Sequence, residues 1–444
     1  MTWTGYGPGV PASLTVPTTS YDVRRHKLRN GLRVVLAPDR SAPVVAVAVY
    51  YDVGIRSEPE GRTGFAHLFE HLMFQGSASL EKMEHVNYVI SSGGTFNGST
   101  RLDYTNYYEV LPSNALERAL FLESDRMRSP RVTEENLRNQ IDVVKEEIRV
   151  NILNEPYGGF PWLTLPPVLF DTFPNAHNGY GAFEDLEGAT VEDASEFFKR
   201  YYAPGNAVLA IGGDIDPDEA LALVEKHFGD IPRRTTPPRP DFSEPDLTEE
   251  RRAEHVDRNA ATPAVALGWR VPDPVADLDA YLPFVVLAEL LTRGDASRLR
   301  SRLVHDDHLA SDVSASLGFM EDAFDVRDPT AFVVTAHHAA DATSDQVVSA
   351  IDDELARLVR DGLTDDELGR VQARTAATLL SRNDFVLGRT LAMASLEQQR
   401  QEPGLVGELP ARIGAVTAEQ VVQAARTLRP DRRARLDLIA GGQR

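Results

Sequence analysis

A proline-rich segment near the middle of the chain limits the possible folds most, because it divides the sequence into two parts of similar length. Residues 232–248, PRRTTPPRPDFSEPDLT, contain five prolines among charged and polar residues. Proline fixes φ and lacks a backbone N–H, so such a segment favours an extended linker over a helix or a central strand. A chain of 444 residues is also too long for a single hydrophobic core. We therefore predict a first half at 1–231, a linker at 232–248 and a second half at 249–444.

Both halves carry the same kinds of elements in a similar order. The Asn30-Gly31 dipeptide predicts a hairpin turn within 26–38, because this pair favours the positive φ angles of tight turns. Apolar segments predict strands at 42–54, 91–112 (two strands), 206–215, 263–272 and 330–339. Amphipathic segments predict helices at 65–76, 114–129, 133–155, 192–202, 216–232, 276–294 and 344–362. This order indicates a duplicated α+β unit, although the halves share little similarity residue by residue.

The segment FAHLFEHLMFQG (65–76) places three ionisable side chains in a mostly apolar predicted helix. His67 and His71 are four residues apart, so both imidazoles project from one helix face and can share a metal ion, usually zinc. Glu70 lies on the same face, where it could take a proton from a water molecule bound to the metal. A lone histidine on such a face is more often a hydrogen-bonded core residue, but the pattern H-x-x-E-H is a metallopeptidase signature.

A catalytic zinc ion requires a third protein ligand, and the chain has no cysteine to supply it. Glu147 in IDVVKEEIRV is the best candidate, because it lies next to Ile148 at the border of the apolar helix stripe. An acidic side chain there needs a partner, and zinc would be one. Glu146 points about 100° away and is expected to face solvent. The pattern alone leaves the role of Glu147 open.

The composition excludes some classes of partner. The formal net charge is −21, which disfavours binding to nucleic acid and to anionic membranes. No apolar run reaches the roughly 18 residues that a membrane-spanning helix needs. The first residues lack the basic and apolar regions of a signal peptide, so we expect a cytoplasmic protein.

These motifs together resemble the pitrilysin/insulinase family of zinc peptidases, above all its branch with mitochondrial processing peptidase and bacterial homologues. The family pattern is H-x-x-E-H followed by a glutamate some 76 residues later, which matches the step from His71 to Glu147. Three further segments are similar to family boxes: 93–112, 197–216 and, more loosely, 296–311. The resemblance implies that His67, His71 and Glu147 hold Zn²⁺ and that Glu70 is the general base.

The resemblance also implies two homologous α+β halves, each an antiparallel sheet backed by helices, which close like a clamshell. A peptide substrate would add as a strand to the edge formed by Phe96, Asn97, Gly98, Ser99 and Thr100. Gly98 stands where the family usually has alanine. Read without the family, Asn97 and Gly98 predict a simple turn or bulge.

Two departures from the family pattern concern activity. Gln140 replaces a glutamate of many relatives, which leaves a hydrogen-bonding role near the metal ligands but removes the charge. Active relatives use an Arg and a Tyr of the second half to bind the substrate carbonyl and the developing oxyanion. Arg298 fits the Arg, although a surface helix arginine is an equally good interpretation, and Ser311 stands at the Tyr position.

The leading hypothesis is a zinc-dependent endopeptidase that hydrolyses unfolded peptides or short polypeptides. Because the Arg/Tyr pair is incomplete, we expect a dimer in which a homologous subunit supplies that pair, either a heterodimer or a homodimer. The alternative is a non-catalytic scaffold subunit of the same family. Scaffold members usually lose zinc ligands, whereas this chain keeps all three and the base.

Overall fold

The structure is a computed structural model, and it describes residues 16–236, 238–320, 322–339 and 341–441. The first half contains the strands β1 (Arg24–Lys27), β2 (Arg33–Pro38), β3 (Val44–Tyr51), β4 (Thr95–Thr100), β5 (Thr105–Pro112) and β6 (Ala207–Gly213). Its helices are α1 (Phe65–Leu72), α2 (Glu84–Ser91), α3 (Leu116–Arg128), α4 (Glu134–Ile148), α5 (Pro166–Leu169), α6 (Phe173–Ala176), α7 (Phe183–Glu187), α8 (Val191–Tyr201) and α9 (Pro217–Phe228). The described residues of the predicted linker form neither helix nor strand.

The second half contains the strands β7 (Arg251–Asp257), β8 (Ala264–Val271), β9 (Ala310–Leu317), β10 (Thr330–His338) and β11 (Arg433–Ala440). Its helices are α10 (Leu278–Thr292), α11 (Arg298–Arg300), α12 (Ser344–Asp361), α13 (Asp365–Asp384), α14 (Val386–Arg400), α15 (Leu409–Gly414) and α16 (Ala418–Thr427). No helix in the described ranges is long and apolar enough to cross a membrane.

The two sheets share one topology, which confirms the duplicated α+β unit. The first sheet has the order β1-β2-β6-β3-β5-β4, and the second has the order β7-β11-β8-β10-β9. Apart from the extra β1, each strand of one sheet has a counterpart at the same place in the other. The predicted antiparallel sheets are wrong in one respect, because β2 pairs with β6 and β7 pairs with β11 in parallel. Both sheets are therefore mixed: a strand from the end of each half returns beside its first long strand.

Several local predictions are confirmed, with shorter elements than expected. The Asn30-Gly31 turn joins β1 and β2, and Gly31 has a φ of 99°. The hydroxyl of Thr133 accepts a hydrogen bond from the backbone N–H of Asn136, which caps α4 as predicted. The predicted helix 65–76 ends at Leu72, and the predicted helix 133–155 changes into a π-helical turn at Arg149–Leu153.

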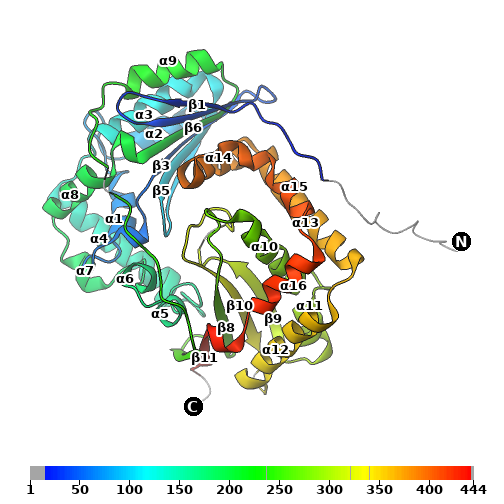
Figure 1. Cartoon of the computed structure of the whole chain (residues 1–444). Coiled ribbons are helices and arrows are strands. Elements are labelled where there is room, and N and C mark those ends of the chain that lie inside the picture. Colours follow the sequence, from blue (N-terminus) through cyan, green and yellow to red (C-terminus); the bar gives the residue numbers. More distant parts are fainter. Residues whose placement is uncertain (1–15, 237, 321, 340, 442–444) are drawn as a thin grey trace, which may run out of the picture.

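The two halves exchange helices across their sheets. Alternate residues of a strand face opposite sides, so Val34 and Leu36 pack with the helices of the first half. Val35 and Ala37 face the other side, which α14 of the second half covers. In return α5 of the first half packs against β7 and β11 (Figure 1). Each half therefore completes the core of the other.

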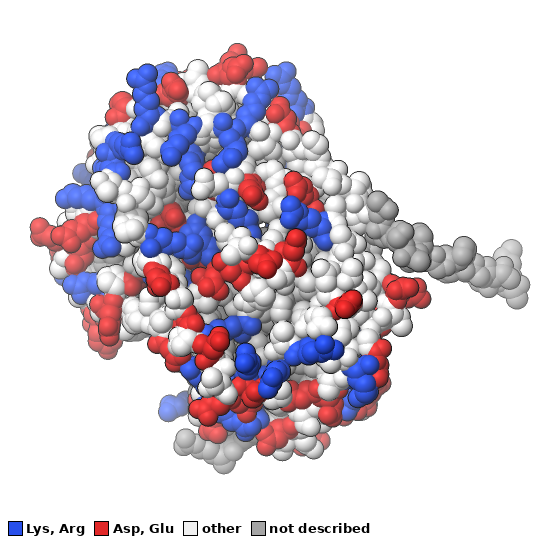
Figure 2. Space-filling model, in the orientation of Figure 1, with Lys and Arg blue, Asp and Glu red and all other residues white. Residues whose placement is uncertain are grey.

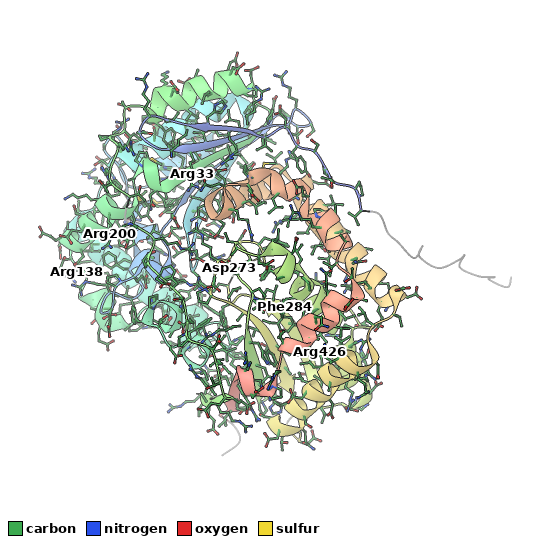
Figure 3. The ribbon with its side chains drawn as sticks, in the orientation of Figure 1. Arg33, Arg138, Arg200, Asp273, Phe284 and Arg426 are labelled. Carbon is green, nitrogen blue, oxygen red and sulfur yellow. The ribbon has the colours of Figure 1, made fainter. Side chains whose placement is uncertain are left out.

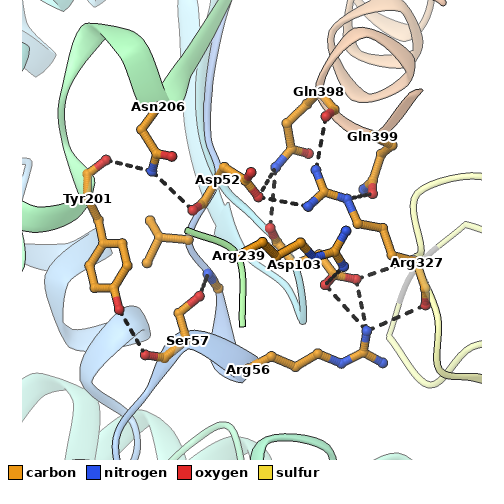
Figure 4. A network of polar contacts seen from close by, with 12 residues as sticks. Asp52, Arg56, Ser57, Asp103, Tyr201, Asn206, Arg239, Arg327, Gln398 and Gln399 are labelled. Atoms are coloured by element: carbon orange, nitrogen blue, oxygen red, sulfur yellow. Dashed lines mark hydrogen bonds and ion pairs between the residues drawn. The ribbon is translucent and has the colours of Figure 1, made fainter. Parts of the chain in front are cut away.

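Polar contacts reinforce this exchange. The Arg33 guanidinium on β2 donates a hydrogen bond of 2.9 Å to the carbonyl oxygen of Glu397 in α14 (Figure 3). A buried network gathers between the halves, where Arg327 of the β9–β10 loop pairs with Asp52 at 2.9 Å (Figure 4). Asp103 in the same network pairs with Arg56 at 3.2 Å and with Arg239 of the linker at 3.3 Å. Acidic and basic side chains are interspersed over the face of the molecule in Figure 2.

Candidate metal centre

Helix α1 is fixed at its first turn by a buried carboxylate. Gly64 precedes the helix with a φ of 79°, a conformation that glycine adopts without strain. The side chain of Glu58 accepts hydrogen bonds from the backbone N–H groups of Gly64 (2.9 Å) and Ala66 (2.7 Å). These N–H groups have no partner within the helix, and a carboxylate at this end is also favoured by the helix dipole. The start of α1, and with it the position of His67, is thereby set.

His67, His71 and Glu147 converge as the sequence predicts. Nε2 of His67 lies 3.6 Å from Oε1 of Glu147, and Nε2 of His71 lies 3.3 Å from Oε2 of the same carboxylate. One ligand atom from each residue lies within 4.8 Å of the other two. Two imidazoles and one carboxylate form a donor set that suits zinc and leaves a position open for substrate. The residues present therefore fit a catalytic zinc ion.

The charges of these groups agree with metal binding. Burial lowers the pKa of His67 to about 4, with help from the neighbouring His71. The hydrogen bond with His71 lowers the pKa of Glu147. Burial favours the neutral form of His71, but the hydrogen bond to Glu147 and the charge of Glu70 outweigh it and raise its pKa. Metal ligation requires neutral imidazole and ionised carboxylate, and His67 and Glu147 are already biased toward those forms.

Glu70 lies beside this group, between α1 and the edge strand β4. Its Oε2 accepts a hydrogen bond of 2.7 Å from the Thr100 hydroxyl. A Cβ atom placed on Gly98 would lie 3.2 Å from Oε1 of Glu70, so the glycine leaves room for the carboxylate. Burial raises the pKa of Glu70, although the Thr100 hydrogen bond opposes the rise. A carboxylate that is held in place and more basic than usual suits a general base.

A loop from the far end of the first half closes one side of the centre. The Tyr180 hydroxyl donates a hydrogen bond of 3.4 Å to Oε1 of Glu147. The Tyr180 ring stands edge-on to the His67 ring, with centroids 5.1 Å apart. Burial raises the pKa of Tyr180 to about 12. The loop is tied back to α1, because Nε2 of His177 lies 3.0 Å from the same Glu58 carboxylate that caps the helix.

The centre opens into a pocket of about 230 Å³. Met320 of the second half lines this pocket, so both halves contribute to its wall. The remaining lining residues come from the first half: Ile55, His67, Glu70, Gly98, Ser99, Thr100, Arg101, Glu147, Gly179 and Tyr180. The pocket is thus lined by two of the predicted ligands, His67 and Glu147, by the predicted base and by one cation, Arg101.

The predicted substrate edge adjoins the pocket. Phe96, Asn97, Gly98 and Ser99 lie on β4, which ends the first sheet and pairs only with β5 in the described part of the chain. The backbone N–H of Gly98 donates a hydrogen bond of 2.8 Å to Oδ1 of Asn97. The alternative of a turn at Asn97 and Gly98 is therefore wrong, because both residues belong to a regular strand.

The other predicted site residues lie at different distances from the centre. Gln140 is buried, and its side-chain amide donates a hydrogen bond of 3.0 Å to Oδ1 of Asn139 and helps to raise the pKa of His71. Its role behind the ligands stays a prediction. The structure does not bring Arg298 to the pocket: its guanidinium binds Glu367 (3.0 and 3.1 Å) and the carbonyl oxygen of Gly362. The Ser311 hydroxyl donates to the carbonyl oxygen of His337, also outside the pocket.

A second cluster of His85, Glu109 and Glu123 has similar composition but a different character. Nε2 of His85 lies 2.9 Å from Oε1 of Glu109, and Nε of Arg126 donates to Glu123 at 2.9 Å. Burial raises the pKa of both Glu109 and Glu123 to about 7. Arg126 and a retained proton balance the two carboxyl groups, so the cluster is a closed structural network behind β4 and β5.

Sequence reasoning missed three residues of the site: Glu58, Arg101 and Tyr180. Thr100 is predicted only as part of the substrate edge, and Arg101 lies between the two predicted β segments, where no pattern selects it. Glu58 and Tyr180 lie in irregular segments without periodicity, and the contact that joins these segments, from Glu58 to His177 over 119 positions, leaves no signal in one sequence.

Comparison with known proteins agrees with this geometry. Residues 33–155 match the model of "Insulinase (Peptidase family M16)", and residues 188–375 match that of "Peptidase M16 inactive domain". The zinc protease PqqE of Helicobacter pylori is 29% identical over 362 residues, which cover 80% of this chain and 78% of the relative.

Two solved structures share the fold. A protease from Helicobacter pylori superposes with a TM-score of 0.86 at 25% identity, covering 94% of this chain and 100% of the other. The periplasmic protease PqqL of Escherichia coli has a TM-score of 0.77 at 20% identity, covering 96% of this chain and 48% of the other. With the inverted histidine–glutamate motif, its distant glutamate and two sheets of one topology in place, the chain belongs to the insulinase/pitrilysin family of peptidases, family M16.

Proposed function

We propose that this chain is a zinc-dependent endopeptidase that hydrolyses unfolded peptides or short polypeptides. One observation carries the proposal: Glu70 is held by Thr100 between the three converging ligands and a free strand edge. A base in that position can act on a water molecule next to a peptide bound at the edge. Zinc stored in a merely structural site would need neither this base nor an open pocket.

The reaction follows from these positions. When bound to His67, His71 and Glu147, zinc would polarise the scissile carbonyl group and acidify a water molecule. Glu70 takes a proton from that water molecule while the water oxygen bonds to the carbonyl carbon of the substrate. The C–N bond then breaks, and Glu70 returns the proton to the leaving amine. Thr100 keeps the Glu70 carboxylate aimed at the reacting atoms throughout.

The edge of β4 gives a means of binding that depends little on sequence. An extended peptide can add to this edge through backbone hydrogen bonds, and its side chains would alternate between the pocket and solvent. The bond from the Gly98 N–H to Asn97 is one that a substrate carbonyl could replace. Most strands of a folded protein are already paired and cannot extend along the β4 edge, so unfolded peptides are the substrate class we propose.

Cleavage of an unstructured peptide mixture by the purified chain, with zinc supplied, tests the proposal. Cleavage should disappear in Glu70→Gln while the zinc content stays near one per chain. Glu147→Gln should lose zinc, whereas the matched control Glu146→Gln should keep it, because Glu146 is exposed and pairs only with Arg149. Cleavage that persists in Glu70→Gln would refute the proposed mechanism.

The same assay addresses the remaining expectations. Zinc binding without cleavage by the isolated chain would favour a missing homologous subunit, which stays a prediction. Absence of both zinc and cleavage would favour the scaffold alternative. We keep the cytoplasmic location as part of the proposal, and fractionation of the producing cell tests it, since the similar protein PqqL is described as periplasmic.

A further inference from the structure

We infer that Arg101 and Tyr180 together receive the negatively charged carbonyl oxygen that forms when water attacks the substrate. The inference rests on the proposed peptidase function and names two catalytic residues for it. When the water oxygen bonds to the carbonyl carbon, the π electrons of the C=O bond move to the carbonyl oxygen. Donors aimed at that oxygen stabilise the transition state more than the substrate. The pocket should therefore contain such donors.

Arg101 is the cation of this pocket, and its backbone is firmly held. It follows β4 directly; its N–H donates to the carbonyl oxygen of Tyr104 at 2.8 Å, and its own carbonyl oxygen accepts from Ile55 at 2.9 Å. The guanidinium lines the pocket, and its Nη1 donates to the carbonyl oxygen of Thr100 at 3.1 Å. Thr100 in turn holds Glu70. The cation is thus one residue away from the group that positions the base.

In the described part of the chain, no ion pair neutralises the positive charge of Arg101. Among the residues that the structure describes, no carboxylate lies within 4.0 Å of the Arg101 guanidinium, whereas nearby Arg56 pairs with Asp103 at 3.2 Å. An arginine with one backbone hydrogen bond keeps most of its donors for a ligand. A guanidinium beside the reacting group can bind a developing oxyanion through two N–H groups.

Tyr180 supplies the second donor of the pocket from a separate loop. Its ring is fixed by His67 on one side and by Trp162, whose ring centroid lies 5.5 Å away, on another. Its hydroxyl bond to Glu147 is long, at 3.4 Å, and therefore weak. The hydroxyl can turn from that contact to a stronger, negatively charged acceptor without any movement of the ring.

The second half offers no competing pair within this chain. Arg298 is committed to Glu367 and to the carbonyl of Gly362, and Ser311 to the carbonyl of His337. Neither residue lines the pocket. With Arg101 and Tyr180 in place, the isolated chain holds every group that peptide hydrolysis requires of the protein.

The test compares Arg101→Met and Tyr180→Phe with wild type in two independent measurements. The first is steady-state cleavage of an unstructured peptide. The second is calorimetric binding of an alanine-based phosphinic pseudopeptide, in which –PO₂⁻–CH₂– replaces one –CO–NH– group and mimics the oxyanion. The corresponding amide peptide is bound to the same variants carrying Glu70→Gln as well, so that it is not cleaved. Its Kd measures the affinity for the intact substrate. Arg138→Met is the matched control, because Arg138 lies on the outer surface of α4 and pairs only with exposed groups (Figure 3).

We expect Arg101→Met to lower kcat by about 100-fold with KM changed by less than about 3-fold, the typical effect of losing one oxyanion donor. The Kd of the phosphinic peptide should rise by a similar factor, while the Kd of the amide counterpart and the zinc content stay nearly constant. Arg101→Lys should recover part of both losses, and Tyr180→Phe should cause a smaller loss of the same kind. Arg138→Met should behave like wild type.

Other outcomes separate this inference from the proposed function. A raised KM at constant kcat, or an unchanged Kd for the phosphinic peptide, would overturn the oxyanion role of Arg101. Failure of the wild type to bind the phosphinic peptide would overturn it as well. If the wild type cleaves nothing but binds the phosphinic peptide in an Arg101-dependent way, peptide hydrolysis by the isolated chain is refuted, a missing homologous subunit is favoured, and the assignment of the anion site stands.

Discussion

Replacement of Arg327 by methionine should measure how much the polar network between the halves contributes to the free energy of unfolding, separately from the apolar cores. The guanidinium is almost fully buried and makes three side-chain contacts (Figure 4): Nη1 with Asp52 at 2.9 Å, Nη2 with the carbonyl of Gln398 at 2.9 Å, and Nε with Gln399 at 2.5 Å. Methionine fills much of the same volume but removes all three. The change therefore tests hydrogen bonding and charge more than packing.

The expected loss follows from the groups that remain behind. Removing one partner of a buried ion pair costs about 3–5 kcal/mol, because the other charge stays without compensation. Asp52 keeps a hydrogen bond of 3.2 Å from Gln398 and about one third of its side chain is exposed, so water can solvate part of its charge. We therefore expect Arg327→Met to lower the free energy of unfolding by about 3 kcal/mol, the low end of that range.

Urea unfolding followed by circular dichroism, with zinc held constant, measures this loss. A double-mutant cycle with Asp52→Asn should show a coupling energy of about 1–3 kcal/mol, because the second change removes the charge that the first leaves unpaired. Arg360→Met is the matched control, since Arg360 is exposed and pairs only with its neighbour Asp361. A loss below about 1 kcal/mol, or additive effects in the cycle, would contradict the reasoning.

Three further changes test the site and the buried cluster behind it. Thr100→Val should lower kcat about tenfold with zinc retained, because Glu70 loses a hydrogen bond worth about 1.5 kcal/mol; unchanged kcat would show that Glu70 is positioned otherwise. Gly98→Val should lower kcat/KM by more than about 10-fold, because the new Cβ would press on the Glu70 carboxylate. Activity equal to wild type would show that β4 can shift to make room for the side chain. The folded chain keeps a proton on Glu109 up to about pH 7, which the unfolded chain releases near its ordinary pKa of 4.5. The stability that this group contributes is therefore lost as pH rises between those values. The free energy of unfolding in urea, measured from pH 5 to 8, should decline less steeply with pH in Glu109→Gln than in wild type. Parallel curves for the two proteins would contradict the raised pKa of Glu109.

The metal ligands could be predicted from the sequence because local spacing determines their geometry. His67 and His71 are brought together by a single turn of helix. Glu147 borders the apolar stripe of α4, whose members Leu137, Ile141, Val144 and Ile148 are all buried. This pattern leaves the role of Glu147 open, and the family spacing selects it as the third ligand. The edge strand could be predicted for the same reason, since alternation and turn residues act over short distances.

The features that the sequence did not predict all depend on contacts between segments that are far apart in the chain. The parallel pairing of β2 with β6 joins residues some 175 positions apart, and no local pattern distinguishes it from antiparallel pairing. The same holds for Tyr180, which meets His67 through a loop held by long-range contacts, among them those of His177 with Glu58 and of Ala182 with Thr63. Arg298 stands at a motif position, but its burial against Glu367 depends on how α11, α12 and α13 pack, which the motif does not specify.

The exchange of helices explains why the first half, which carries the predicted metal ligands, depends on the second half, which supplies no ligand. Tyr50, Ala48, Val35 and Ala37 form an apolar face on the first sheet, and α14 of the second half is what covers it. The strands under that face end at the pocket: β3 leads to Asp52 and to the turn that fixes Arg101, and β5 holds β4 in register. Without α14, this face would meet water, and the strands that set the positions of Gly98 and Thr100 would lose half of their packing. The second half thus acts on the chemistry through the first sheet, and the loop that carries Arg327 also brings Met320 to the pocket wall. Substitutions under α14 should therefore alter catalysis as well as stability, although they lie on the opposite side of the sheet from Glu70.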